Sequence, residues 1–229
     1  LQVVEEGDWR SRGVSGSFEP IGVLWHHTAA TSSEGNPAPS LQLVIDGRPD
    51  LQGPLCHALV DYHGVFHVIS ANRANHAGDT RASGPIPDGD GNELLIGWEI
   101  DYAGDQAPDG PADQAMTAAQ YSASVAATAA VLRQLQRDAN FARGHRETST
   151  TGKIDPSFVN LDQMRADVAR AMAGGTSGAA HLVIVGTDGV VYHQVRRPNW
   201  SWTGFQPLEE EVERHDLGER GGVTQCVGA

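Results

Sequence analysis

Short apolar runs, each ended by polar or turn-forming residues, are the main pattern in the first half of the chain. Residues 21–28 form such a run, typical of a strand buried on both faces. Residues 55–60 and 65–69 are two more, and the turn-forming residues between them predict a hairpin. Residues 94–100 predict another interior strand, with the carboxylate of Glu99 inside it. The pattern therefore predicts a buried sheet.

Helical spacing appears mainly in the second half. Between residues 116 and 137 the chain is alanine-rich and its larger apolar residues recur at helical spacing, which predicts the principal packing helix. Residues 161–172 predict a final helix, whereas residues 41–45 fit either a short helix or a packed loop. Strands and helices thus share one domain, as in an α/β protein.

Two polar segments interrupt these elements. Residues 72–92 are rich in Gly, Pro and Asp and predict a long surface excursion, of the kind that is often functional or disordered. Residues 144–156 predict a loop that carries His145, Lys153 and Asp155 and ends in a proline. Ten residues separate His145 from Asp155, so these side chains can meet only if the chain folds back.

The C-terminal part changes character. Residues 174–178 predict a flexible linker between a domain of residues 1–173 and a small β-rich tail of residues 179–229. The tail opens with a hairpin signature and continues into a tryptophan-rich segment. It resembles one repeat of actinobacterial β-propeller lectin-like domains. One such repeat cannot bury its own faces, so it would dock on the main domain, pair with a second copy or stay loosely ordered.

The composition excludes some classes of partner. The chain has 229 residues, a net charge of −13 and a pI near 5.0, which argues against nucleic-acid binding because phosphate contacts need clustered Lys and Arg. No apolar run is long enough for a membrane span. The chain starts with Leu1 instead of Met and shows no signal-peptide layout, which leaves an upstream segment and secretion open. Cys56 and Cys226 predict two separate thiols, with a bridge between them as the alternative. We expect a monomer, or pairing through the tail.

Several side chains have the chemistry of a metal-assisted hydrolase. His26 and His27 end the first strand, and only one of them can point to a given face. Two imidazoles and a carboxylate with one open position form a catalytic zinc layout, although a strand histidine is more often structural. Glu99 in a buried strand is either functional or faces water at a sheet edge. Lys153 has the charge to stabilise an oxyanion.

Five motifs follow one another in order between about residues 20 and 173. Together they resemble the type 2 N-acetylmuramoyl-L-alanine amidase family, which includes bacterial cell-wall amidases, actinobacteriophage endolysins and peptidoglycan recognition proteins. The motifs are Trp-His-His-Thr-Ala at 25–29, Cys-His-Ala-Leu-Val-Asp at 56–61 with His67, Asn-His-Ala-Gly at 75–78, Ile-Gly-Trp-Glu-Ile at 96–100, and Gly-His-Arg at 144–146 with Gly-Lys-Ile-Asp-Pro at 152–156.

This resemblance implies an α/β fold with a mixed central β-sheet flanked by helices and a Zn²⁺ ion in a groove on one side. By position in the motifs, His26, His145 and Asp155 match the family's three zinc ligands. Glu99 matches the acid/base carboxylate, and Lys153 matches the residue that polarises the substrate carbonyl.

The remaining motif residues are assigned less directly. His76 would line the substrate groove, and His27 and Trp98 are further candidates for substrate binding. The segment between Gly78 and Glu93 is longer and richer in Gly and Asp than the family leads us to expect. Three histidines have no family role and predict surface or core positions, with a second weak metal site as the alternative: His57, His63 and His67.

The resulting hypothesis is zinc-dependent hydrolysis of the amide bond between N-acetylmuramic acid and L-alanine in bacterial peptidoglycan. The protein would act at the cell wall, either outside the cell or after release from the cytoplasm as a phage lysin. The main alternative is a non-catalytic peptidoglycan-binding module of the same fold. A third possibility is a carbohydrate-binding protein that acts through its tryptophan-rich tail.

Overall fold

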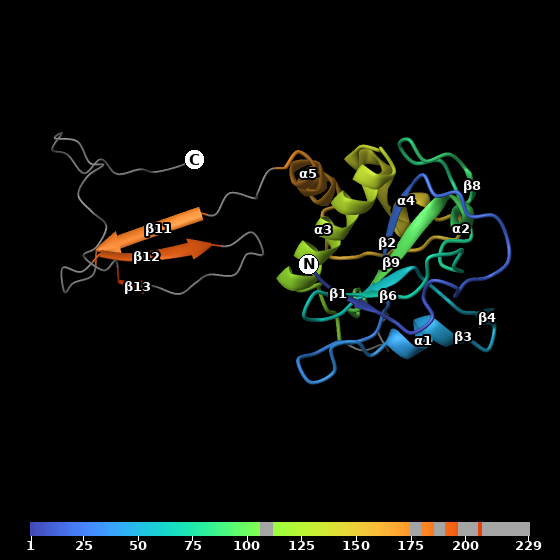
Figure 1. Cartoon of the computed structure of the whole chain (residues 1–229), viewed down its shortest axis with the longest axis horizontal. Helices are drawn as coiled ribbons and strands as arrows, with labels where there is room; N and C mark the ends of the chain where they lie inside the picture. Colours follow the sequence, from blue (N-terminus) through green and yellow to red (C-terminus); the bar gives the residue numbers. More distant parts are fainter. Residues whose placement is uncertain (106–111, 175–179, 186–190, 197–205, 208–229) are drawn as a thin grey trace. The chain divides into compact units, whose positions relative to one another are not determined.

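The chain forms two compact units. A computed structural model describes residues 1–105, 112–174, 180–185, 191–196 and 206–207 (Figure 1). The first unit includes residues 1–178 and contains all five motifs of the family resemblance. Within the described residues, no helix is both long and apolar enough to cross a membrane.

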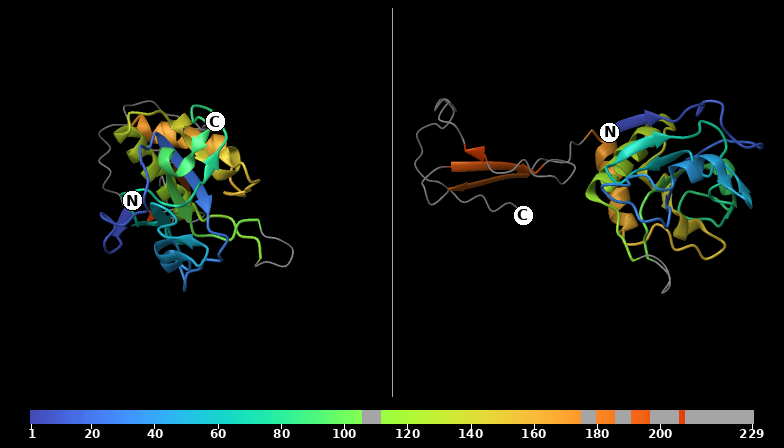
Figure 2. Two further views of the ribbon diagram at one scale, coloured as in Figure 1. Left: turned by 90° about the vertical axis from the view of Figure 1, so that its right-hand side faces the viewer. Right: turned by 90° about the horizontal axis from the view of Figure 1, so that it is seen from below.

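A six-stranded mixed sheet forms the centre of the first unit, with strand order β1-β6-β5-β9-β2-β10. Strands β5, β9, β2 and β10 are mutually parallel, β6 is antiparallel to β5, and β1 lies parallel to β6 at the outer edge (Figure 2). The predicted mixed sheet is therefore confirmed. The strands are β1 (Gln2–Glu5), β2 (Gly22–His27), β5 (Ala58–Val60), β6 (Val65–Val68), β9 (Leu95–Ile100) and β10 (Ala142–Gly144).

Two long helices, α3 (Ala118–Gln134) and α5 (Leu161–Met172), pack against each other over one face of the sheet (Figure 1). A capping box of Thr117 and Gln120 starts α3, and the side chain of Asn160 caps α5. The shorter elements are α1 (Leu41–Asp46), β3 (Gly47–Arg48), β4 (Leu51–Gln52), β7 (Asp79–Thr80), β8 (Gly89–Asp90), α2 (Gly91–Leu94), a 3₁₀ turn (Ala139–Phe141) and α4 (His145–Thr148).

Strand β2 is buried along its whole length, and its side chains alternate between two environments. Val23 and Trp25 belong to the main core under α3 and α5. Leu24 belongs to a smaller cluster with Ile86 and Leu95 on the opposite face. His26 follows Leu24 by two residues, so it also lies on the face away from α3.

The main core contains one buried hydroxyl group that bonds to both strand tryptophans, that of Thr128 in the middle of α3. The indole N–H groups of Trp25 and Trp98 both donate to Thr128 Oγ1, at 2.9 and 3.3 Å. The hydroxyl in turn donates to the carbonyl of Ser124 at 2.7 Å. One hydroxyl thereby pairs two buried indole donors from neighbouring strands, which fixes the register of α3 on the sheet.

The predicted elements are present, with differences at their ends. Residues 41–45 are helical as part of α1. The predicted hairpin is formed by β5 and β6. Strand β5 starts three residues later than predicted, because the backbone N–H of Leu55 donates to the carbonyl of Val44 in α1. Residues 145–148, predicted as loop, are helical. Strands β1 and β10 were not predicted, since neither stands out as an apolar run.

The second unit contains a three-stranded sheet of β11 (Ala180–Val185), β12 (Val191–Arg196) and β13 (Gln206–Pro207). β11 and β12 pair in antiparallel register from Ala180 with Arg196 to Val185 with Val191, which confirms the predicted hairpin. The tryptophan-rich segment of the predicted tail and the second cysteine lie outside the described residues: Trp200, Trp202, Phe205 and Cys226. Cys56 is buried with a free thiol.

We predict that Thr128→Val lowers the free energy of unfolding by about 1–3 kcal/mol, because it leaves two buried indole donors without an acceptor. Thr128→Ser is the matched control, since it keeps the hydroxyl and removes only a methyl group. Urea unfolding of both variants measures the effect. An equal loss in the two variants would mean that packing, and not the hydroxyl, accounts for the stability.

Candidate metal and catalytic site

The site lies at the carboxyl ends of three parallel strands. In the register of β2 and β9, His26 pairs with Glu99. Strand β10 ends at Gly144, which pairs with Trp25 of β2, and α4 begins at the next residue, His145. Parallel strands gather the residues that follow them at one edge, which is where open α/β sheets bind their ligands.

Three donor atoms meet at this edge. His26 Nδ1, His145 Nδ1 and Asp155 Oδ2 are pairwise 3.1 Å apart, and all three side chains are buried. The chain folds back between residues 145 and 155, so that Arg146 donates its backbone N–H to the carbonyl of Asp155 at 2.7 Å. The fold-back that the sequence requires is therefore present.

Hydrogen bonding alone does not satisfy this triangle. If both imidazoles bear a hydrogen on Nδ1, the two N–H groups face each other at 3.1 Å. If one of them does not, the lone pair of its Nδ1 faces Asp155 Oδ2 at the same distance. A cation at the centre satisfies all three atoms as lone-pair donors. Ligand atoms about 2.0–2.1 Å from a tetrahedral zinc ion lie about 3.3–3.4 Å apart, close to this spacing. The donor set fits zinc.

The protonation states favour metal binding. Burial, partly offset by the hydrogen bond to Asp155, lowers the pKa of His26 to about 4, so the imidazole is neutral at neutral pH. Burial alone would raise the pKa of Asp155, but hydrogen bonds with His145 and His26 outweigh it and hold that pKa below its usual value. Neutral imidazole and ionised carboxylate are the forms that bind metal ions.

Glu99 lies next to this group and is not tied into it. Burial raises the pKa of Glu99 well above its usual value, and the negative charges of Asp155 and Asp101 act in the same direction. Its Oε2 atom is buried and has no hydrogen-bond partner. A carboxyl group with an elevated pKa and an unpaired oxygen is suited to take up and release a proton.

Lys153 lies at the solvent side of the same group. Lys153 is exposed, and its backbone N–H donates to Ser149 Oγ at 3.2 Å. The positive charge of Lys153 contributes to lowering the pKa of both His26 and Glu99. An ammonium in this position can stabilise negative charge that develops on a bound carbonyl.

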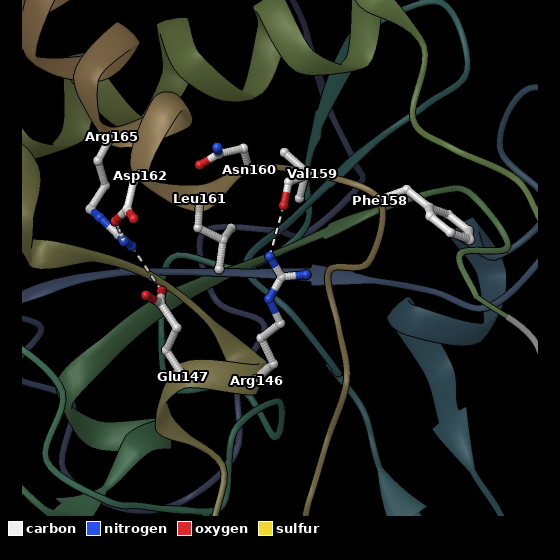
Figure 3. Close-up of a pocket in the computed structure, with 8 residues that line it drawn as sticks. All are labelled: Arg146, Glu147, Phe158, Val159, Asn160, Leu161, Asp162 and Arg165. Carbon is white, nitrogen blue, oxygen red and sulfur yellow. Dashed lines mark hydrogen bonds and ion pairs between the residues drawn. The ribbon is translucent and has the colours of Figure 1, made fainter.

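Arg146 holds the segment that carries Asp155. Its guanidinium donates to the carbonyl of Pro156 and, at 2.7 Å, to that of Val159, as Figure 3 shows for the second bond. These bonds, with the backbone bond to Asp155, fix the chain on both sides of the carboxylate. Sequence reasoning did not single out Arg146, although it directly follows His145 in the Gly-His-Arg motif.

A cleft of about 550 Å³ lies beside this clamp but does not contain the donor triangle (Figure 3). Arg165 donates to Glu147 at 2.8 Å and also to Asp162, so these charges are paired with each other. These ion pairs join the first turns of α5 to α4. Its lining residues are Arg146, Glu147, Phe158, Val159, Asn160, Leu161, Asp162 and Arg165.

Two predicted substrate-binding residues lie away from the triangle. Trp98 is 2% exposed and packs in the main core against Phe66, because alternation along β9 points it away from Glu99. His27 is buried beside Tyr102, and its Nδ1 accepts the backbone N–H of Ser157 at 3.1 Å. The structure gives Trp98 a core position and lets His27 hold the loop after Asp155.

His76 does come to the site, but behind His26. Its Nδ1 lies 3.1 Å from His26 Nε2, and its Nε2 lies 3.0 Å from the carbonyl oxygen of Leu95. It therefore contacts a predicted ligand on the side opposite the donor triangle.

The other histidines form no second metal centre among the described residues, where the triangle is the only cluster of this kind found. His67 lies between Glu6 at 2.7 Å and Asp61 at 3.6 Å. His57 is buried and stacks on Phe18 with ring centroids 4.8 Å apart. His57 and His67 thus have structural positions.

The chain is similar to known proteins in sequence and in fold. The sequence profile of one family, N-acetylmuramoyl-L-alanine amidase, matches residues 17–158. Similar folds include the catalytic domain of XlyA (18% identity, 73% of this chain and 99% of that chain, TM-score 0.53) and a mutant endolysin from Bacillus subtilis (17%, 73% and 99%, TM-score 0.52). AmiD from E. coli, in complex with the substrate anhydro-N-acetylmuramic acid-L-Ala-D-gamma-Glu-L-Lys, is also similar (18%, 78% and 71%, TM-score 0.50). A comparison with curated proteins gave no match.

The burial of His57 predicts an acid-sensitive fold. Burial lowers the pKa of His57 to about 3, so the unfolded chain takes up a proton near pH 6.5 that the native state does not. Stability from His57 is therefore present at neutral pH and is lost as the pH falls below about 6.5. For this group the loss between about pH 7 and about pH 4.5 is about 2–3 kcal/mol.

His57→Asn tests this prediction, because its Oδ1 can replace Nδ1 as the acceptor for the N–H of Gly97, a 3.0 Å bond, without titrating. Urea unfolding at the two pH values should show a smaller acid-induced loss in His57→Asn than in the unaltered protein. The same loss in both proteins would contradict a buried neutral His57.

Proposed function

Because the chain belongs to the family of N-acetylmuramoyl-L-alanine amidases, we propose that it uses zinc to hydrolyse bacterial peptidoglycan. The chain is an amidase by family, and the bond cleaved would be the amide between N-acetylmuramic acid and L-alanine. The enzyme would act at the bacterial cell wall, whether exported or released as a phage lysin. The substrate in the complex of the similar AmiD contains the same linkage and supports this assignment.

One observation carries the proposal. Three buried donor atoms lie pairwise 3.1 Å apart in an arrangement that hydrogen bonding cannot satisfy, and Glu99 lies beside them with an unpaired oxygen. His26, His145 and Asp155 would hold the ion. Bound zinc supplies Lewis-acid chemistry, which lowers the pKa of water and polarises a carbonyl.

The side chains around the ion divide the remaining work. Glu99 would accept a proton from the attacking water as the new C–O bond forms at the amide carbon. Lys153 would stabilise the negative charge on the carbonyl oxygen. When the C–N bond breaks, Glu99 would return its proton to the nitrogen of L-alanine. The balance is one water consumed, one carboxylic acid formed and one amine released.

Glu99→Gln and Asp155→Ala separate metal binding from proton transfer. Glu99→Gln should keep zinc at one ion per chain and lose about 100-fold or more in kcat, because it cannot accept a proton. Asp155→Ala should lose both zinc and activity. Metal analysis and mass spectrometry of digested peptidoglycan measure the two effects on the same samples, and Glu19→Gln, an exposed carboxylate away from the site, is the control.

The products decide the bond that is cleaved. Free stem peptides that begin at L-alanine are the expected result. New reducing sugar ends would instead indicate a glycosidase, and stoichiometric zinc with full activity in Asp155→Ala would refute the ligand assignment. A protein that bound peptidoglycan and zinc without releasing peptides would be a non-catalytic recognition module.

We also propose that residues 179–229 help the enzyme bind the cell wall. The tail contains its own three-stranded sheet, which supports a separate role. Truncation after Ala173 should weaken binding to intact cell walls in a sedimentation assay but leave hydrolysis of soluble muropeptides unchanged. Equal wall binding by the truncated and full chains would contradict a targeting role.

A further inference from the structure

We infer that His76 is a positioning residue that fixes the tautomer of His26, so that an Nδ1 lone pair faces His145 and Asp155. The inference rests on the zinc site proposed above and adds a residue to it. It is built on contacts that lie outside the donor triangle, on the other side of the His26 ring.

The proton arrangement starts at the carbonyl of Leu95. This oxygen can only accept, and it lies 3.0 Å from His76 Nε2, so Nε2 must bear the hydrogen. A neutral imidazole has one N–H group, so His76 Nδ1 is an acceptor.

That acceptor determines the state of His26. His26 Nε2 lies 3.1 Å from His76 Nδ1 and must donate to it, with the two rings edge to face at 87°. The neutral His26 ring then has no hydrogen on Nδ1, the atom that faces the triangle. Asp155 Oδ2 favours the other tautomer of His26, because it lies 3.1 Å from Nδ1 and could accept a hydrogen bond from an Nδ1–H group. In that tautomer the Nδ1 lone pair would not be available to a metal ion. The hydrogen bond to His76 favours the tautomer with the hydrogen on Nε2.

The His76 ring packs directly against the backbone of β9 at Gly97. A Cβ atom on Gly97 would lie 2.2 Å from His76 Nδ1, so any side chain at this position of β9 would displace the ring. The backbone N–H of His76 donates to Asn92 Oδ1 at 2.8 Å, which holds the other end of the residue. A glycine within a buried strand is thereby explained by the approach of His76.

Two variants distinguish tautomer control from packing. His76→Asn can present its Oδ1 where Nδ1 was and still accept from His26, whereas His76→Phe keeps a ring over Gly97 but has no acceptor. Mutation of a residue that hydrogen-bonds to a metal-bound histidine typically lowers the metal affinity about 10- to 100-fold. We expect a loss of zinc affinity of this size in His76→Phe. His76→Asn should lose less.

Zinc affinity is measured on the full chain by competition with a chelator, and thermal melting of each metal-free variant reports its folding. No loss in His76→Phe, or a loss in His76→Asn that equals or exceeds it, overturns the inference. If the unaltered protein bound no zinc, the proposed function itself would fail, which is a different result.

A measurement on the unaltered protein decides the question without any variant. Nitrogen-15 spectra of the metal-free protein distinguish protonated from unprotonated ring nitrogens. We expect Nε2–H for both His76 and His26. Finding the hydrogen on Nδ1 of either ring overturns the inference even if both variants fail to fold.

Discussion

The pairing of two fully interior strands, β2 and β9, is the constraint on which the core and the site both depend. Because side chains alternate along each strand, one register sends Trp25 and Trp98 to Thr128 under α3 and sends His26 and Glu99 together to the other face. A shift of one residue in either strand would exchange the core side chains with those of the candidate site. Packing of the core therefore also determines the geometry of the site.

Much of this arrangement follows from local patterns. The strands containing His26 and Glu99 were predictable from their apolar runs, and alternation already indicated that His26 and His27 face opposite ways. The fold-back of the loop was predictable only as a requirement, because the ten residues from His145 to Asp155 contain no pattern that specifies it. The ligand assignment came from the resemblance to a family, and not from spacing.

Other parts of the site depend on contacts between residues far apart in the sequence. Nothing near His76 indicates that its ring lies between His26 and the carbonyl of Leu95, because that position depends on the space above Gly97. Trp98 illustrates the converse: it was a candidate for substrate binding, whereas alternation along β9 puts it in the core. Neighbours in a strand are on opposite sides of the sheet, which a motif written as letters does not convey.

The buried polar groups also show how stability and function oppose each other here. At Asp101 burial is compensated, since Thr28 and Ser40 donate to its carboxylate at 2.7–3.0 Å and hold the chain that leaves β2. At Glu99 an oxygen is left unpaired, and at the donor triangle two imidazole nitrogens face each other. Both arrangements cost folding free energy in the metal-free chain. A bound cation would offset that cost at the triangle, because it would accept the lone pairs of all three donor atoms. The affinity for the metal and the stability of the fold would then be thermodynamically linked.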